Sequence, residues 1–220
     1  QEQLLLNIGC TDSLNIAVFV PLYDKILMNY PHLDLSIQSH HSSELYGMLS
    51  EHNIDIGFVY HQLHYKNIIS EKLFEEKLYL VQSEHPSVEK PIVHTDELDS
   101  TKELFLSWDD NFQIWHDRWL SSVSRPHISA DTITLLDRLW KNADTWMIAP
   151  ESVIHELSRY RKVYVSELKN PAPNRICYKI KHKYPKTTSK RAVELFEEIL
   201  DQSLRLERKE IPIGEIWGGR

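Results

Sequence analysis

The first sixty residues alternate between segments with the apolar pattern of buried strands and segments with the apolar spacing of helices. Apolar runs at 4–9 and 56–59, and the alternation of apolar residues at 33–37, predict three strands. Between them, apolar residues recur at helical spacing over 16–27 and 45–49. The resulting order of strand, helix, strand, helix, strand predicts a parallel sheet with right-handed crossovers.

The remaining chain continues this mixture of strands and helices. Further strands are predicted at 73–81, 104–106, 146–150, 161–168 and 176–180. Further helices are predicted at 112–120, 133–140, 153–160 and 189 to about 208. Pro21 should kink the first helical stretch or start a new one, because proline interrupts a helix interior. Residues 211–220 contain Pro and Gly and predict a loose tail.

Hydroxyl side chains stand where the first two predicted strands end. In parallel sheets, ligands bind outside the carboxyl ends of the strands, which here lie at 11–13 and 40–43. Thr11, Ser13 and Ser42 occupy these segments just before helices, where free backbone N–H groups favour an anion. The hydroxyl groups either bind a small ligand or cap the two helices, and the two roles are compatible.

Composition and charge narrow the class of protein. The chain has 220 residues, of which 41% are hydrophobic and 26% charged, so an ordinary globular protein is expected rather than a disordered one. A formal net charge of −7 argues against specific DNA binding by this chain alone, because phosphate binding needs clustered Lys and Arg. No apolar run has transmembrane length and no signal peptide opens the chain, so we expect a cytoplasmic protein that does not contact a membrane.

Two cysteines, Cys10 and Cys177, lie far apart in the sequence and do not make a disulfide framework. They are consistent with a reducing compartment. Structural thiols are the favoured interpretation, with a redox switch as the alternative.

Catalytic and metal-binding motifs are missing from the sequence. It contains no Gly-x-Ser-x-Gly elbow, no Gly-x4-Gly-Lys phosphate loop and no Gly-x-Gly-x2-Gly segment. The close histidine pairs are His40-His41 and His61-x2-His64, and no Cys-x2-Cys or His-Glu-x2-His accompanies them. A solvated loop is the favoured interpretation of the second pair. We therefore expect a protein that is not an enzyme and has no metal and no cofactor.

The identities of residues 40–60 are more informative than their periodicity. Ser42-x-Glu44-Leu45-x3-Leu49, followed by Ile54-Asp55-Ile56-Gly57-Phe58-Val59, resembles the first half of the effector-binding domain of LysR-type transcriptional regulators. Other segments agree with that family in the same order along nearly the whole chain. These segments are Ile8-Gly9, Phe19, Pro21, Tyr30-Pro31-x-Leu33, the strand at 73–81 and the turn His85-Pro86.

The resemblance implies an α/β fold with two Rossmann-like lobes joined by two crossing strands, as in type 2 periplasmic binding proteins. Lobe one would comprise residues 1–75 and 178–211, lobe two residues 76–177, and residues 212–220 would form a flexible tail. The family senses a small-molecule effector in the cleft between the lobes and pairs as a homodimer through these domains. It binds DNA only through an N-terminal helix-turn-helix domain, which we expect to be absent from this chain.

The resemblance also assigns five effector-binding residues. Thr11, Ser13 and Ser42 match the hydroxyl positions that line the family's effector pockets. Asp131 stands where the family has a neutral residue at a pocket-facing helix start, and its charge would disfavour a purely anionic effector; its alternative role is an N-cap. Trp108 follows a strand end and forms either an aromatic wall or part of the core.

Two segments depart from the family pattern. Ala143 and Thr145 stand where the family often has glycines, and His40-His41 stands where a glycine is common. Glycine permits tight turns and a close backbone approach, so these departures put the shape of the pocket wall in doubt.

Three other functions remain open at this stage. A solute-binding protein of a transporter would have the same fold, together with a signal peptide. An enzyme on the same scaffold would depend on a carboxylate such as Asp109 or Asp131, because fold alone does not fix function. A histidine-based metal sensor would lose its metal when His61 and His64 are replaced.

Overall fold

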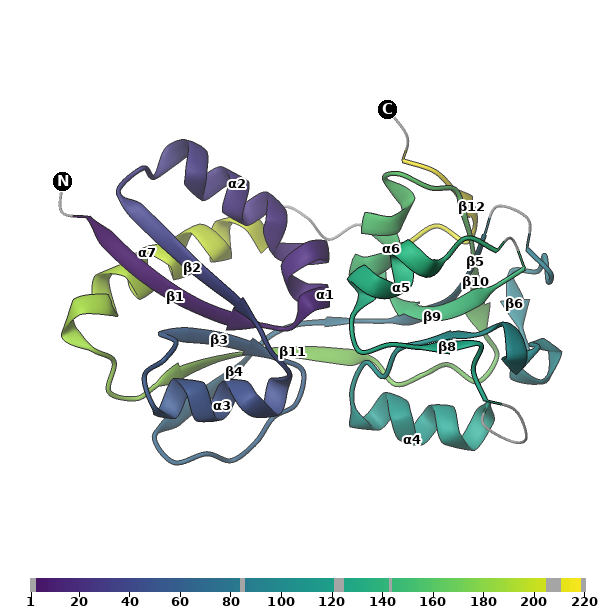
Figure 1. The fold of residues 1–220 in the computed structure, drawn as a ribbon, viewed down its shortest axis with the longest axis horizontal. Helices are drawn as coiled ribbons and strands as arrows, with labels where there is room; N and C mark the ends of the chain where they lie inside the picture. Colours follow the sequence, from purple (N-terminus) through teal and green to yellow (C-terminus); the bar gives the residue numbers. More distant parts are fainter. Residues whose placement is uncertain (1–2, 84–85, 121–124, 143, 205–210, 219–220) are drawn as a thin grey trace. The chain divides into compact units, whose positions relative to one another are not determined.

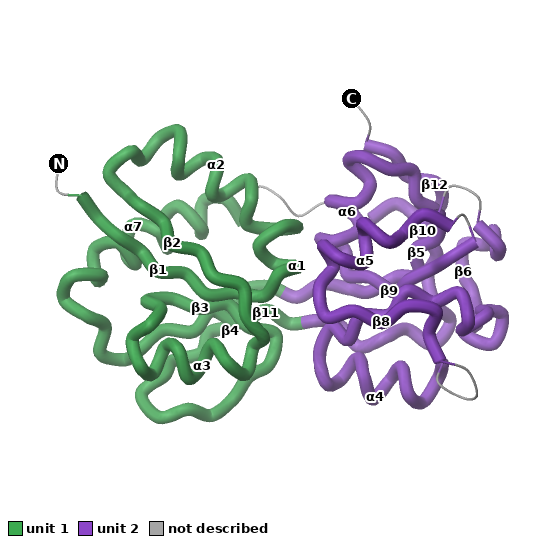
Figure 2. Tube along the Cα trace, in the orientation of Figure 1, with its two compact units in different colours: residues 1–74, 176–209 green, residues 75–175, 210–220 purple. Residues whose placement is uncertain are grey.

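The computed structural model describes residues 3–83, 86–120, 125–142, 144–204 and 211–218. The chain divides into two compact units, which Figure 2 colours separately. Unit 1 comprises Gln1–Phe74 and Ile176–Lys209, and unit 2 comprises Glu75–Arg175 and Glu210–Arg220. The lobe boundaries expected from the sequence, 75/76 and 177/178, compare with 74/75 and 175/176 in the structure.

Unit 1 is built on a five-stranded sheet with the strand order β2-β1-β3-β11-β4 (Figure 1). Its strands are β1 (Leu4–Cys10), β2 (Leu33–Ser39), β3 (Ile56–Val59), β4 (Ile68–Glu76) and β11 (Arg175–His182). As the order of elements predicts, β1 pairs in parallel with both β2 and β3. β11 returns antiparallel to β3. The carboxyl ends of β1, β2 and β3 therefore share one edge of the sheet.

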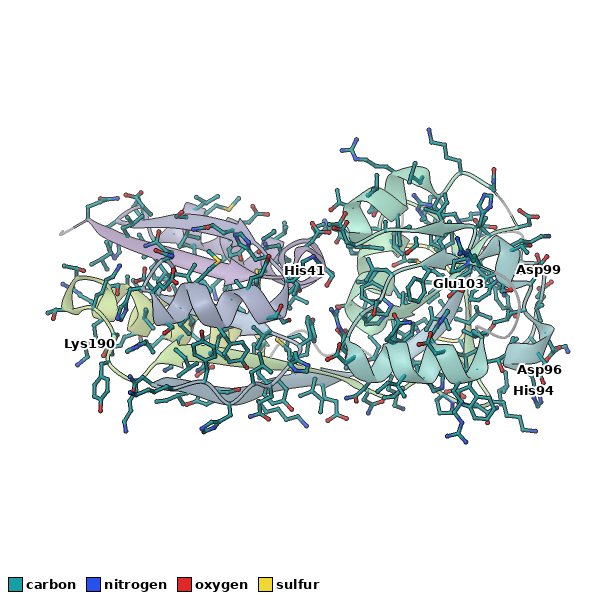
Figure 3. The ribbon with its side chains drawn as sticks, turned by 60° about the horizontal axis from the view of Figure 1, so that its bottom comes forward. His41, His94, Asp96, Asp99, Glu103 and Lys190 are labelled. Atoms are coloured by element: carbon teal, nitrogen blue, oxygen red, sulfur yellow. The ribbon has the colours of Figure 1, made fainter. Side chains whose placement is uncertain are left out.

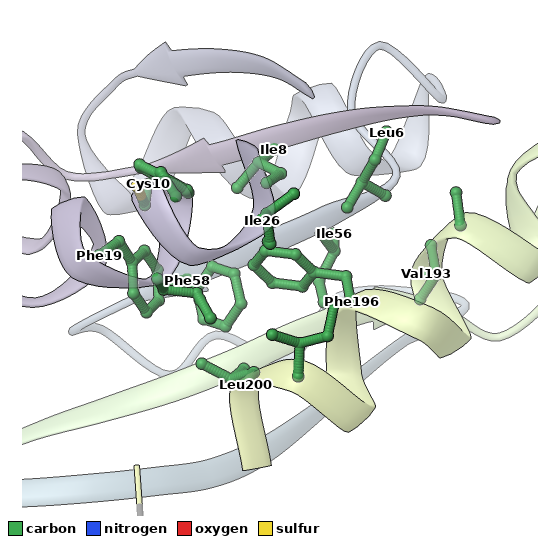
Figure 4. Close-up of a cluster of buried hydrophobic side chains, with 14 of the residues drawn as sticks. Leu6, Ile8, Cys10, Phe19, Ile26, Ile56, Phe58, Val193, Phe196 and Leu200 are labelled. Carbon is green, nitrogen blue, oxygen red and sulfur yellow. Dashed lines mark hydrogen bonds between the residues drawn. The ribbon is translucent and has the colours of Figure 1, made fainter. Parts of the chain in front are cut away.

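The helices of unit 1 cover both faces of this sheet. They are α1 (Asp12–Leu14), the π-helical η1 (Asn15–Phe19), α2 (Val20–Asn29), α3 (Ser42–Ser50) and α7 (Thr187–Leu204). α2 and α7 pack on one core cluster, shown in Figure 4, where the ring centroids of Phe19 and Phe58 lie 4.6 Å apart. α3 packs on a second cluster. In β3, Phe58 belongs to the first cluster and Val59 to the second, as alternation along a strand requires.

The first helical stretch differs from its prediction in the side that it buries. Helical spacing places Val20 and Leu27 on the inward side of one continuous helix, whereas they are 40% and 69% exposed. The wider π-helical turn of η1 precedes them and rotates the following residues relative to a regular α-helix. Pro21 stands in the first turn of α2, directly after η1, so the change from π-helix to α-helix occurs next to the proline.

Unit 2 is built on a sheet with the strand order β12-β10-β5-β9, in which β6 also pairs with β10, and on a small sheet of β7 and β8 (Figure 1). Its strands are β5 (Leu78–Ser83), β6 (Ile92–Val93), β7 (Leu104–Phe105), β8 (Ile128–Ser129), β9 (Trp146–Pro150), β10 (Val163–Leu168) and β12 (Gly214–Ile216). Its helices are α4 (Asp110–Trp119), α5 (Ile133–Leu139) and α6 (Glu151–Ser158), with 3-10 turns η2 (Thr95–Glu97) and η3 (Ser100–Lys102). β5 pairs antiparallel with β9 and β10.

Local sequence signals explain where two of these helices begin. The carboxylate of Asp109 accepts a hydrogen bond from the backbone N–H of Phe112 at 2.8 Å and so caps α4. Pro150 ends β9 and is the N-cap residue of α6. Val153 and Leu157, four residues apart on α6, are both buried. No helix among the described residues is long and apolar enough to cross a membrane.

The end of the chain, expected to be a flexible tail, contains a short strand. Gly214–Ile216 form β12, which pairs antiparallel with β10. Ile216 has high β propensity and pairs with Val163 of β10, a sheet edge that the sequence alone does not reveal. That residues 212–220 are flexible stays a prediction.

Some predictions fall outside the described residues. The last helix begins at Thr187 and is described to Leu204, so its predicted end at 205–208 lies outside them. His85 of the His-Pro turn and Ala143 of the glycine-poor segment lie outside them as well.

Candidate functional site

Polar groups gather at the edge of unit 1 where β1 and β2 end. Cys10 and Ser39, the last residues of the two strands, are register partners. The backbone N–H of His40 donates to the carbonyl of Cys10 at 3.0 Å, so the chain stays paired one step beyond β2. This pairing fixes the backbone from which the following polar side chains project.

Asn15, the first residue of η1, bridges these two strand ends. Its side-chain Nδ2 donates to the hydroxyl of Ser39 at 2.8 Å, and its Oδ1 accepts from the thiol of Cys10 at 2.7 Å. The same Oδ1 accepts from the hydroxyl of Tyr23 in α2 at 2.8 Å. One amide therefore holds β1, β2 and α2 together at the edge, and a half-buried amide with three partners is rigid.

The thiol of Cys10 belongs to this network but is expected to be unreactive. Its side chain is fully buried, and burial raises the pKa of the Cys10 thiol from 9.0 to about 12. The free cysteines Cys10 and Cys177 are both buried. A thiol that stays protonated at neutral pH is a poor nucleophile, so the geometry favours the structural interpretation of Cys10 over a redox switch.

Thr11 and Ser13 lie next to each other in the turn after β1. Their hydroxyl oxygens are 3.5 Å apart. Thr11 is the N-cap residue of α1, but its side chain makes no capping hydrogen bond; its backbone carbonyl accepts from Leu14 and Asn15 instead. Ser13 is 6% exposed. The side-chain capping role that the sequence offers for Thr11 is therefore not the one it has.

Ser42 links the start of α3 to the end of β3. Its hydroxyl oxygen accepts from the backbone N–H of Tyr60, the residue after β3, at 3.0 Å. The N-cap of α3 is His41, labelled in Figure 3, and not Ser42. Because its oxygen is an acceptor here, the Ser42 hydroxyl still has a proton to donate.

Acidic side chains occupy both helix starts at this edge. Asp12 lies in the first turn of α1, and Glu44 lies in the first turn of α3. The Oε2 atom of Glu44 accepts a hydrogen bond from the backbone N–H of His41 at 3.1 Å. The same atom lies 3.5 Å from the Nδ1 of His40. Carboxylates at these positions offset the positive end of each helix, which removes much of the expected preference for an anion.

Trp108, the expected aromatic residue of unit 2, is a core side chain with 4% exposure. Its indole N–H donates to the carbonyl of Ile148 in β9 at 2.7 Å. The guanidinium of Arg175 lies 5.0 Å from the Trp108 ring centroid and donates to the Trp108 carbonyl at 3.2 Å. Little of the ring or its N–H is left for a ligand.

Asp131, the other expected residue of unit 2, is exposed and precedes α5 by two residues. The N-cap of α5 is Thr132, so Asp131 does not have the N-cap role that the sequence offers for it. No hydrogen bond or ion pair of the Asp131 carboxylate occurs within the part of the chain that the structure describes. The structure thus places Thr11, Ser13 and Ser42 in unit 1, and it places Trp108 and Asp131 in unit 2.

Asn15 and Ser39 were missed by sequence reasoning. Asn15 falls inside a predicted helical stretch, and Ser39 at the end of a predicted strand. The one available signal was the run of polar residues after Gly9. It does not point to Asn15 or Ser39, because only the register of β1 against β2 brings these two side chains together.

A metal centre is not formed by the histidine pairs. Among residues 3–83, 86–120, 125–142, 144–204 and 211–218, no group of three or more His, Cys, Asp or Glu side chains could hold a metal ion. The loop with His61 and His64 is held by Tyr46, whose hydroxyl donates to the His61 carbonyl and accepts from the Leu63 N–H, both at 3.0 Å. His64 is exposed, as a solvated loop requires.

Comparison with known proteins identifies the family. Residues 1–205 match the family model of the LysR substrate binding domain. The chain belongs to this family. No curated protein matches its sequence.

Solved structures agree with the family in fold. The reduced OxyR regulatory domain from Pseudomonas aeruginosa has a TM-score of 0.73 and 16% identity, covering 93% of this chain and 98% of that one. The reduced OxyR2 regulatory domain from Vibrio vulnificus has a TM-score of 0.67 and 16% identity, covering 91% and 95%. The regulatory domain of MexT, a transcriptional activator in Pseudomonas aeruginosa, has a TM-score of 0.71 and 12% identity, covering 90% and 99%.

The expected fold class and function are thereby confirmed. The chain has the α/β fold of LysR substrate-binding domains, which is that of type 2 periplasmic binding proteins. It is an effector-sensing regulatory domain of a transcriptional regulator. Regulatory domains of this family are generally non-enzymatic, and the regulators bind small-molecule effectors and act as oligomers on DNA.

Proposed function

We propose that this LysR-type domain binds its small-molecule effector at the edge of unit 1 where β1, β2 and β3 end. Thr11, Ser13 and Ser42 would donate or accept the hydrogen bonds that fix the effector. The observation that carries this proposal is the Thr11 side chain, which stands at a helix start without capping it. A hydroxyl held at a rigid strand end and not used by the helix is well suited to a ligand.

Asn15 and Ser39 would preorganise these hydroxyls rather than bind the effector alone. Their hydrogen bond joins the ends of β1 and β2, so it fixes the turn from which Thr11 and Ser13 project. Preorganised polar groups lose little entropy when a ligand binds, which favours affinity.

The effector class that we propose is a neutral or amine-bearing polar metabolite. Asp12 and Glu44 give both helix starts a nearby negative charge. A purely anionic effector would be repelled by these carboxylates, whereas an amine or a zwitterion would be tolerated. Trp108 and Asp131, the other two residues that the resemblance assigns to effector binding, belong to unit 2.

The regulator would act as a homodimer in the cytoplasm and reach DNA through a helix-turn-helix domain outside this chain. Support for a homodimer comes from α2, where Val20, Leu27 and Met28 are 40%, 69% and 81% exposed. Their spacing places them on one helix face, and exposed apolar faces mark interaction sites. Replacing Leu27 by Asp should convert the dimer to a monomer in multi-angle light scattering.

The effector site can be tested by thermal-shift screening. Amino acids, amines, nucleosides and carboxylates would be screened against this domain; a ligand at 100 times its dissociation constant adds roughly 2.7 kcal/mol of stability. Hits would be repeated with Thr11→Ala and Ser42→Ala, and with Thr188→Ala, an exposed residue of α7, as the control. A hit weakened by the first two changes alone supports the site. A hit indifferent to both places the effector elsewhere.

A further inference from the structure

The last strand of the chain lies beyond the part that the family shares. The match to the LysR substrate binding domain ends at residue 205, whereas β12 comprises Gly214–Ile216. β12 pairs antiparallel with β10 through three residue pairs, Val163 with Ile216, Tyr164 with Glu215 and Val165 with Gly214. Figure 1 shows this segment beside β10 at the edge of the unit 2 sheet.

Residues on both sides of β12 also hold it to unit 2. Ile211 is 6% exposed. The backbone N–H of Gly218 donates to the carbonyl of Ser158, the last residue of α6, at 2.7 Å. The ammonium of Lys162 lies 5.6 Å from the Trp217 ring centroid. Residues 211–218 are therefore docked on unit 2 through the strand pairing, one backbone hydrogen bond and one cation–π contact.

The position of this segment in the chain gives the docking a consequence. α7 belongs to unit 1, and the residues from 210 onward belong to unit 2. Two strands, β4 and β11, already carry the chain from one unit to the other. When β12 is docked, the chain that follows α7 forms a third connection between unit 1 and unit 2.

We propose that residues 211–218 act as a releasable strap that restrains the relative motion of the two units. Docked on β10, the strap adds a third link between them; released, it leaves the two strand crossings alone. Because effector-driven switching requires two arrangements with different affinity, a restraint on that motion sets how easily the domain switches.

The docked strap is built to be held weakly. The ladder between β12 and β10 is only three residue pairs long, and the side chains of Ile213 and Trp217 remain 39% and 58% exposed. Short edge strands with few buried apolar contacts open at low free energy, without unfolding of the core. Release of the strap is therefore a local event.

Gly214 offers a way to release the strap within the full chain. Its φ is +111°, a conformation that side-chain-bearing residues rarely adopt, so Gly214→Val strains the docked form and leaves the released form unaffected. Gly218→Pro removes the N–H that donates to Ser158. Gly47→Ala is the matched control, because nothing lies within 4 Å of a Cβ added at Gly47.

The test measures release and motion in the same variants. Hydrogen exchange of β10 reports docking, and the double variant should exchange at 163–165 about tenfold faster than the wild type. Motion is measured by double electron–electron resonance, which gives the distribution of distances between spin labels on Lys190→Cys of α7 and Ile114→Cys of α4. Both positions are exposed, and the two native cysteines are buried and should not take up label.

The expected result is a broader distance distribution in the double variant and an unchanged one in Gly47→Ala. Faster exchange in β10 with an unchanged distribution overturns the proposal, because release would then not affect motion. Unchanged exchange in β10 also overturns it, since the strap would not be releasable. Loss of protection that spreads to β5 and β9 overturns it too, because the strap would then be part of the core of unit 2.

Discussion

Gly9 of β1 and Gly57 of β3 are register partners in the sheet of unit 1. A Cβ at Gly9 would lie 2.5 Å from the Cδ2 of Leu45 and 2.7 Å from the Cδ1 of Ile54, and both of these side chains are fully buried. A Cβ at Gly57 would lie 2.8 Å from the Cγ1 of Ile180. Gly9 thus lets Leu45 of α3 and Ile54 pack directly on the sheet, and Gly57 leaves room for the Ile180 side chain of β11.

Gly9→Ala should destabilise the protein by about 1–3 kcal/mol, because the surrounding core must move to admit one methyl group. Gly47→Ala, in α3 with open space around it, should instead be neutral or stabilise by about 0.5–1 kcal/mol. Urea unfolding measures both. Equal effects of the two changes would show that the sheet has room at Gly9.

Asn15→Ala should lower the free energy of unfolding by about 1–3 kcal/mol, since the hydroxyl of Tyr23 and the thiol of Cys10 lose their acceptor. Asn29→Ala is the control: its side chain donates only to the Lys25 carbonyl on an exposed helix end. The same variants belong in the effector screen. An Asn15→Ala protein with full stability and unchanged effector affinity would contradict the preorganising role.

The Glu103 carboxylate and the His116 ring form a buried pair in unit 2, with Nε2 2.8 Å from Oε1 and side chains 2% and 4% exposed. Glu103→Ala should cost about 1–3 kcal/mol, because a buried ring nitrogen loses its partner. The exposed pair of Lys190 and Glu194 is the contrast, and Glu194→Ala should change stability by about 0.5 kcal/mol or less. Figure 3 labels Glu103 in unit 2 and Lys190 in unit 1.

A double-mutant cycle with His116→Ala separates the pair from simple loss of packing. A coupling energy of about 1 kcal/mol or more between positions 103 and 116 is expected for a genuine pair. Additive losses would mean that the two side chains contribute only volume.

The buried thiol of Cys10 predicts a pH dependence at alkaline pH. Its pKa is about 12 in the folded protein, above the value of 9.0 for a free thiol, so the protonated form is favoured by folding. That stability is fully present below about pH 9 and is lost as pH rises toward 12, at up to about 1.4 kcal/mol per pH unit. Cys10→Ala should make this slope shallower when urea unfolding is followed between about pH 8.5 and 10.5. The buried Tyr23 hydroxyl, whose pKa is also raised, should keep a residual slope near the upper end.

Thiol reactivity provides an independent check on the same residue. Neither Cys10 nor Cys177 should react with a thiol reagent in the folded protein at pH 7, and both should react in denaturant. Rapid reaction of either thiol in the folded state would reopen the redox-switch interpretation.

Local patterns predicted the first half of the fold well. The apolar runs of β1 and β3 and the alternation of β2 are visible without the structure because a buried strand needs those side chains wherever it is placed. The parallel order of the strands followed from the helices between them. The same logic placed Thr11, Ser13 and Ser42 at strand ends, because a strand's end is a local property.

Residues whose roles depend on distant partners were beyond this logic. Trp108 could have been a pocket wall or a core residue, and only the carbonyl of Ile148 and the side chain of Arg175 place it in the core. Asn15 became a bridge because η1 aims it at Ser39, across the register of two strands.

The sequence by itself determined the family, the α/β class and the polar ends of the first strands, because each is written in short-range spacing and in residues that stand close together. Only the tertiary structure decided that Asn15 joins two strand ends, that Trp108 is covered, and that Gly214–Ile216 form a strand. A weak segment such as β12 takes its conformation from the edge of β10, and that edge exists only once the rest of unit 2 has folded.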